Sequence, residues 1–298
     1  VVAPKPLNRT HVFKHQGAGG FRGAATYMDR GVVIHPTIFR EEDRELAAKG
    51  VQAEIMIHPG ALVTTPYDMM LNQMIERSRT GRHGSCGYGF NETKQRSLDT
   101  KYRKTIGMLV EITDHELREW LELIRTEYIP LRLAYLGISE VPAPFDEFLT
   151  YESVVDEWIA DLDYLFQNTR MVGPNIINKY ANVVFEQSQG LALSRDSGYF
   201  PHVTREYTGA DNILPLIALD QGNRDIEVTY MVRAYCNKHG AGPLPYEDPE
   251  LKYIDETNAP NEWQGAPRYA PLNLDLLFEL ISADMKKYGD NAYFILNM

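Results

Sequence analysis

Short apolar runs alternate along this chain with longer segments in which apolar residues recur at helical spacing, and this alternation limits the fold more than any other feature. Strands that alternate with helices are typical of an α/β fold. We therefore expect a central mixed, mostly parallel β-sheet flanked by helices. The runs expected to form strands are Val32–His35, Ala53–His58, Val183–Glu186, Glu227–Tyr235 and Tyr293–Leu296.

Two helices are marked clearly by their sequence. The segment Thr113–Glu116 has the pattern of a capping box, in which a threonine and a glutamate satisfy free N–H groups at a helix start. Apolar residues then recur at helical spacing up to Ile124, and a second apolar stripe runs from Val154 to Leu165. Their acidic residues lie mostly off the stripes, so solvated helix faces account for much of the net charge.

Composition restricts the class of protein. With 298 residues and no segment rich enough in Gly, Pro or Ser to mark a linker, residues 1–298 are expected to form a single large domain. The net charge of −11 argues against general binding to nucleic acid or anionic membranes. The two cysteines, Cys86 and Cys236, make no disulfide framework, so a reducing, cytoplasmic location is expected. No apolar run approaches the ~20 residues that span a bilayer.

The stretch His83–Phe90, HGSCGYGF, allows two kinds of chemistry. Glycines let the backbone approach an anion and turn N–H groups toward it, so Gly84 and Gly87 favour a phosphate-binding loop with Ser85 as a further donor. The alternative is a cysteine hydrolase, with Cys86 as nucleophile and His83 as its base. No signature of a known cysteine hydrolase surrounds the cysteine.

Three further polar loops carry glycine. Gln187–Gly190 follows a predicted strand, Lys238–Pro243 follows another, and the segment NEWQGAPRYAP contains Arg268, which could grip a carboxylate bidentately. Open α/β sheets bind ligands at the carboxyl ends of their strands. The loops together predict one composite ligand site.

In this order, the loops resemble those of the adenylosuccinate synthetase family. Its phosphate-binding run IGTTGRG is similar to Gly84–Gly89, and its FEGAQG to Phe185–Gly190. Its YPYVTSSN is similar to Phe200–Arg205, its RVGAGPFPTE to Lys238–Glu247, and its NEFGATTGRRRR…WLD more loosely to NEWQGAPRYAPLNLD, Asn261–Asp275. The resemblance runs from about Val32 onward and implies an α/β domain related to P-loop proteins.

The resemblance implies a purine nucleotide ligase that joins L-aspartate to IMP, with Mg2+ and GTP as phosphate donor, through a 6-phosphoryl intermediate. It implies that Gly84, Ser85, Cys86, Gly87 and Thr204 bind the 5′-phosphate, and that Gln189 supports the reacting edge of the purine as the catalytic contact. It places His239 and Gly240 beside the sugar, and Arg268, Gly265 and Ala266 at the aspartate. It also implies a cytoplasmic homodimer, in which Arg96 reaches the partner's site.

Departures from the family pattern leave alternatives open. The N-terminal glycine-rich loop and the C-terminal end of the family domain are expected to lie outside Val1–Met298, and with them the catalytic base, acid and magnesium ligand, so no metal ligand is predicted here. The arginine cluster is reduced to Arg268, which favours a second reading. That reading is the bacteriophage branch, which uses dGMP and ATP or dATP to make a succinylated precursor of 2-aminoadenine DNA in the host cytoplasm. A non-catalytic nucleotide-binding protein is the third.

Overall fold

The computed structural model describes residues 10–78, 84–221, 224–253, 262–263, 265–289 and 292–297. The chain divides into two compact units. The first comprises Val1–Thr80 and Cys86–Gly173, and the second comprises Gly81–Ser85 and Pro174–Met298. The sequence predicts a single domain over residues 1–298, and that the two units form one domain stays a prediction.

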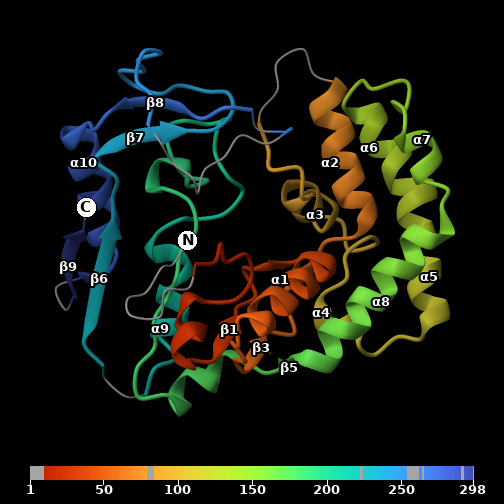
Figure 1. Ribbon diagram of the computed structural model, residues 1–298, viewed down its shortest axis with the longest axis horizontal. Helices are drawn as coiled ribbons and strands as arrows, with labels where there is room; N and C mark the ends of the chain where they lie inside the picture. The colour runs from red at the N-terminus through yellow and green to blue at the C-terminus, as the bar shows by residue number, and fades with distance from the viewer. Residues whose placement is uncertain are drawn as a thin grey trace. The chain divides into compact units, whose positions relative to one another are not determined.

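The first unit contains most of the helices (Figure 1). In chain order, its elements are η1 (Ala18–Arg22), β1 (Thr26–Met28), β2 (Val33–Ile34), α1 (Pro36–Ala48), β3 (Ile55–Ile57), β4 (Leu62–Val63), α2 (Pro66–Ser78), α3 (Phe90–Arg96), α4 (Ile106–Leu109), α5 (Asp114–Leu123), η2 (Ile124–Tyr128), α6 (Ile129–Tyr135), α7 (Phe145–Phe148), α8 (Glu152–Asn168) and β5 (Arg170–Met171).

The described strands of this unit form two small parallel sheets. The order β1-β3-β5 makes one sheet and β2-β4 another, and all of these pairings are parallel. The side chains of β3 are all buried, as are Ile34 of β2 and Val63 of β4. Strands buried on both faces read as continuous apolar runs, which is why the sequence marks β3 clearly.

The helices of the first unit begin where local sequence directs them. The capping box predicted at Thr113 is confirmed, because its hydroxyl accepts from the Glu116 N–H and the Glu116 carboxylate accepts from the Thr113 N–H. Helix α1 starts with a proline after His35, whose ring accepts from the Ile38 N–H. It packs against α8, where Arg40 Nη1 lies 2.6 Å from Asp161 Oδ1.

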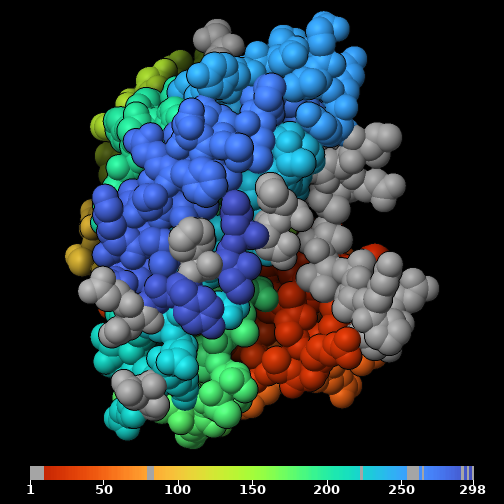
Figure 2. Space-filling model, turned by 90° about the vertical axis from the view of Figure 1, so that its left-hand side faces the viewer, coloured from red at the N-terminus to blue at the C-terminus, as the bar shows by residue number. Residues whose placement is uncertain are grey.

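The second unit has fewer helices and two strand pairs. Its elements are η3 (Pro174–Lys179), η4 (Leu191–Leu193), η5 (Ala210–Asn212), α9 (Leu214–Ile217), β6 (Ile226–Met231), β7 (Tyr235–Lys238), β8 (Arg268–Pro271), α10 (Leu274–Met285) and β9 (Ala292–Asn297). Strands β6 and β9 are parallel, whereas β7 and β8 are antiparallel. Figure 2 shows the side of this unit on which the last part of the chain, in dark blue, reaches the surface.

A buried aspartate holds the second unit together. Asp284 of α10 accepts from the Ala210 N–H at 2.8 Å and from the Tyr230 hydroxyl at 2.7 Å. It therefore joins α10 to η5 and β6. Gly209 has no side chain where Asp284 approaches, since a Cβ there would lie 2.2 Å from the carboxylate oxygen.

The α/β class with mostly parallel pairing is confirmed, although the described strands form four small sheets rather than one central sheet. Two strand predictions are wrong. Residues Val183–Glu186 form no strand, and Val184 is 83% exposed, because no strand among the described residues pairs with this segment. The run Glu227–Tyr235 is split between β6 and β7, which pair with different strands.

Candidate functional site

The Gly84–Gly89 loop has a backbone that only glycine adopts readily. Gly84, Gly87 and Gly89 have φ angles of +77°, +79° and +82°, in the left-handed region. At Gly89, a Cβ would also lie 2.7 Å from the backbone nitrogen of Met69, closer than a side chain permits. The loop leads into α3, for which Gly89 is the N-cap. These positions confirm that the glycines of this motif serve the conformation of the backbone.

Helix α2 holds the loop from within the first unit. The Gly89 N–H donates to Asn72 Oδ1 at 3.1 Å, and Gln73 Nε2 donates to the Gly87 carbonyl at 3.1 Å. The Thr93 hydroxyl adds a bond to the Gly89 carbonyl at 3.0 Å. These bonds hold Gly87 and Gly89 in place before any ligand arrives.

Arg96 is placed differently from its predicted role. Its side chain is fully buried, and the guanidinium donates from Nε to Asp68 Oδ1 at 2.8 Å and from Nη2 to Asp68 Oδ2 at 2.9 Å. It also donates to the Tyr102 and Val63 carbonyls. The prediction that Arg96 reaches a partner subunit would need these contacts to break. Arg96 instead ties α3 to α2 beneath the loop.

The cysteine-hydrolase alternative receives no support from the environment of Cys86. Burial raises the pKa of the Cys86 thiol above its ordinary value and outweighs hydrogen bonds from the backbone. A cysteine nucleophile needs the opposite shift, because the thiolate is the reactive form. The proposed base, His83, lies outside the described residues.

In the second unit, Gln189 has an unusual backbone. Its φ angle is +71°, in a region that side-chain-bearing residues seldom occupy. Such strain is found most often at functional sites, so it favours a role for this residue. The following turn is anchored, since the Gly190 carbonyl accepts from the Thr208 hydroxyl at 3.1 Å and from the Leu193 N–H at 2.9 Å.

Two predicted loops meet through His202 and Gly242. A Cβ on Gly242 would lie 2.4 Å from the His202 ring, so the imidazole packs directly on the glycine backbone. Two residues further on, the Thr204 N–H donates to the Leu193 carbonyl at 2.8 Å. The structure thus connects the Gln189–Gly190 turn, the Thr204 segment and the His239–Gly240 loop inside one unit.

Arg268 binds backbone carbonyls of this loop and a neighbouring glutamate. Its Nη1 donates to the carbonyls of Gly240 and Gly242 at 2.8 and 2.9 Å, and its Nε donates to Glu247 Oε1 at 2.8 Å. Its Nη2 donates to the other oxygen of Glu247. With four donor contacts made, the guanidinium is engaged, and the prediction that it takes the aspartate carboxylates needs those contacts to break. The neighbouring Gly265 and Ala266 are exposed.

Comparison with known proteins decides the family. The sequence profile of adenylosuccinate synthetase matches residues 7–263. The chain belongs to the adenylosuccinate synthetase family. It is 26% identical over 230 residues to the adenylosuccinate synthetase of Leuconostoc citreum and 29% identical over 233 residues to that of Stenotrophomonas maltophilia. These alignments cover 76% and 75% of this chain, and the chain spans about half, 51%, of each relative.

Solved structures show the family fold. Fully ligated adenylosuccinate synthetase from Plasmodium falciparum superposes with a TM-score of 0.57 at 15% identity, covering 87% of this chain and 59% of that one. The succinoaminodeoxyadenylate synthetase of cyanophage S-2L, bound to dGMP and dATP, superposes with a TM-score of 0.53 at 16% identity. That match covers 94% of this chain and 69% of the phage enzyme.

Metal ligands were not predicted on this chain. Within the residues that the structure describes, no three His, Cys, Asp or Glu side chains are grouped so that they could hold a metal ion. Magnesium in nucleotide enzymes is bound largely through substrate phosphates and water. No side chain is therefore assigned to Mg2+. None of the described helices has the length and apolar character needed to cross a membrane.

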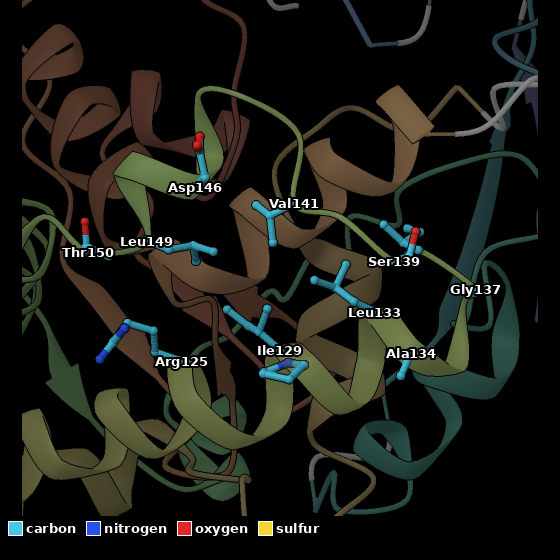
Figure 3. A pocket seen from close by; sticks show the side chains of 12 residues that line it. Arg125, Ile129, Leu133, Ala134, Gly137, Ser139, Val141, Asp146, Leu149 and Thr150 are labelled. Carbon is cyan, nitrogen blue, oxygen red and sulfur yellow. The ribbon is translucent and has the colours of Figure 1, made fainter.

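A pocket of about 750 Å³ opens in the first unit, and none of the residues that line it is a predicted ligand contact. Ile129 and Leu133 point toward Val141 and Leu149 across it (Figure 3). Arg125 lies near one end, and its guanidinium is paired with Glu122. The largely apolar walls do not suit a nucleotide phosphate.

Several residues of the site were missed by sequence reasoning. Asn72 and Gln73 are adjacent polar residues in the middle of α2, and Glu247 follows the Gly240–Pro243 loop. In the sequence, the only sign of their role is that two amide side chains stand between apolar residues, Leu71 and Met74, which are buried in α2. Their partners are backbone groups of a distant loop, which periodicity does not identify.

Proposed function

We propose that this chain binds a purine nucleoside monophosphate and takes part in joining L-aspartate to it, with a nucleoside triphosphate as phosphate donor. The product of this reaction with IMP is adenylosuccinate. The observation that carries the proposal is the family match over residues 7–263, in which the Gly84–Gly89 loop has the left-handed glycines that an anion-binding backbone needs.

The chemistry explains why such a site needs donors more than a protein nucleophile. The 6-oxygen of the purine is a poor leaving group until the triphosphate transfers its terminal phosphoryl group to it. The amine of aspartate then attacks carbon 6, and inorganic phosphate leaves with the former 6-oxygen. Both steps build negative charge on phosphoryl oxygens, and preorganised N–H and O–H donors stabilise that charge.

The proposed roles are divided among the predicted loops. Ser85 and Cys86, on the Gly84–Gly89 loop, donate to the 5′-phosphate, and bonds from α2 hold Gly87 and Gly89 of that loop in place. In the second unit, Thr204 adds a hydroxyl to the phosphate, and Gln189 binds the edge of the purine that reacts. His239 and Gly240 contact the sugar.

A second candidate is the phage-type reaction, in which dGMP replaces IMP and ATP or dATP is the donor. The engagement of Arg268 by Glu247 favours it, because this is the single arginine between residues 254 and 268. With that guanidinium engaged, the segment offers the ribose 2′-hydroxyl no arginine contact, and a deoxynucleotide loses nothing by lacking the hydroxyl. The cyanophage enzyme that shares the fold binds dGMP and dATP.

Thermal unfolding with added ligand tests nucleotide binding by the 298-residue chain. IMP or dGMP at a hundred times its dissociation constant should add ~2.7 kcal/mol to the free energy of unfolding. Whichever of the two raises the melting temperature more at equal concentration identifies the purine. Phosphate release that requires monophosphate, triphosphate and L-aspartate together then tests the reaction.

A pair of serine variants provides the control. Ser85→Ala removes a proposed phosphate donor and should weaken nucleotide binding by about tenfold or more, the usual effect of losing a hydrogen bond to a charged group. Ser139→Ala changes an exposed serine at the rim of the pocket in Figure 3 and should leave binding unchanged. No shift of the melting temperature with either nucleotide would overturn the proposal. Equal effects of the two variants would overturn the role of Ser85.

A further inference from the structure

Lys238 occupies an unusual electrostatic position at the end of β7. In the antiparallel register of β7 and β8, Lys238 lies directly opposite Arg268. Its side chain is half-buried, and the His239–Gly240 turn follows it immediately. Directly opposed residues on paired strands have Cβ atoms ~5 Å apart, and like charges at such positions destabilise the pair.

Nothing in the described part of the chain neutralises Lys238. Both oxygens of Glu247, the nearest acid in the loop sequence, are taken by Arg268. Burial first and Arg268 second lower the pKa of the Lys238 ammonium, and among the described residues no carboxylate acts in the other direction. Arg268 is therefore neutralised by Glu247 and bound to the loop carbonyls, whereas Lys238 is a half-buried cation opposite a second cation.

A cation in this setting costs stability unless an anion compensates it, and such groups gather at binding sites. We propose that Lys238 binds a carboxylate of the amino-acid substrate, in the role that the sequence had suggested for Arg268. This inference rests on the proposed function. In that function Ser85, Cys86 and Thr204 bind the 5′-phosphate, whereas the carboxylates of L-aspartate lose their predicted partner because Glu247 holds Arg268. An ammonium suits a carboxylate as a compact point charge with three donors.

The rate of chemical labelling of lysines measures whether Lys238 is occupied by a ligand, and it requires no enzymatic turnover. Because acylation requires the neutral amine, Lys238 should react faster at pH 8 than the exposed Lys286, which directly follows α10. Peptide mass spectrometry separates the two rates. L-aspartate, added with saturating IMP or dGMP, should slow labelling of Lys238 about tenfold at ten times its dissociation constant and leave Lys286 unchanged.

Variants complete the test. Lys238→Met should raise the dissociation constant for L-aspartate by about tenfold to a hundredfold, whereas Lys286→Met should not change it. Lys238→Arg, which keeps the charge, should retain more affinity than the methionine variant. The melting temperature of each variant shows whether it is folded, and the arginine variant remains informative if the methionine variant is not.

The outcomes separate this inference from the proposed function. Protection by L-aspartate supports it even if no phosphate is released. Protection by inorganic phosphate or by the nucleotide alone, but not by L-aspartate, would show that Lys238 serves a phosphate and would overturn it. Absence of protection by any of them would overturn it too, while the melting-temperature test of nucleotide binding would stand unaffected.

Discussion

Replacing Arg96 with methionine tests whether this side chain supports the loop or serves a partner subunit. Methionine keeps much of the volume but removes the charge and every donor. The carboxylate of Asp68, which is 1% exposed, would keep its bonds from the Thr65 N–H and hydroxyl, both at 2.9 Å, and lose both bonds from Arg96. The Val63 carbonyl would lose its bond from Arg96 as well.

The magnitude follows from burial. Both partners of the pair are almost completely buried, at 0% and 1% exposure. Removing one member of a buried ion pair costs about 3–5 kcal/mol, because the other charge is left without compensation. We expect Arg96→Met to lower the free energy of unfolding of the first unit by that amount. Arg96→Met combined with Asp68→Leu should recover ~2 kcal/mol relative to the sum of the single changes.

Urea unfolding followed by tryptophan fluorescence is the assay. Two of the three tryptophans, Trp120 and Trp158, are buried in the first unit, and the Trp120 indole donates to the same Tyr102 carbonyl that Arg96 binds. The control is Arg118→Met, since the ion pairs of Arg118 with Asp114 and Asp156 are exposed and should contribute less than ~1 kcal/mol.

The result that refutes this reasoning is a stability within ~1 kcal/mol of the unmodified chain. An arginine that projected toward a partner subunit would behave in that way, and its loss would change activity alone. A large loss for Arg96→Met without recovery in the double variant would show that packing, rather than the ion pair, carries the effect.

Three further predictions concern the first unit. Gly89→Ala should destabilise it by about 2 kcal/mol or more in urea unfolding, because of the left-handed φ and the contact with α2; a change under 0.5 kcal/mol contradicts this. Cys86 should react with iodoacetamide more slowly at pH 7.4 than the same cysteine in urea, since burial raises its thiol pKa; equal rates contradict this. Burial lowers the pKa of His15 to about 3 and of His35 to about 4, so the unfolded chain takes up protons first, and stability should fall as pH drops from 6.5 toward 4. His15→Gln should flatten that slope.

The sequence predicted features correctly where the interactions that produce them lie between neighbouring residues. The capping box at Thr113 depends on residues three apart, and the left-handed glycines of the Gly84–Gly89 loop depend on backbone sterics. The strand prediction at Val183–Glu186 failed because an apolar run becomes a strand only when another strand pairs with it. Pairing is a property of the fold, not of the segment.

The roles of side chains in the site likewise depend on partners that are distant in the sequence. The sequence identified Arg96 and Arg268 as cations near ligand loops, but each has an acid partner 28 or 21 residues away that decides what the guanidinium does. Asn72 and Gln73 were overlooked because their partners, Gly89 and Gly87, are reached only when α2 folds beneath the loop.

By itself, the sequence determined the α/β class, the family and the loops that carry glycine, since periodicity and short motifs are written in neighbouring residues. Only the tertiary structure decided which charges remain available to a ligand. The sequence shows both residues as cations. In the structure Glu247 neutralises Arg268, which therefore has a structural role, whereas no carboxylate among the described residues neutralises Lys238, which can therefore bind an anion.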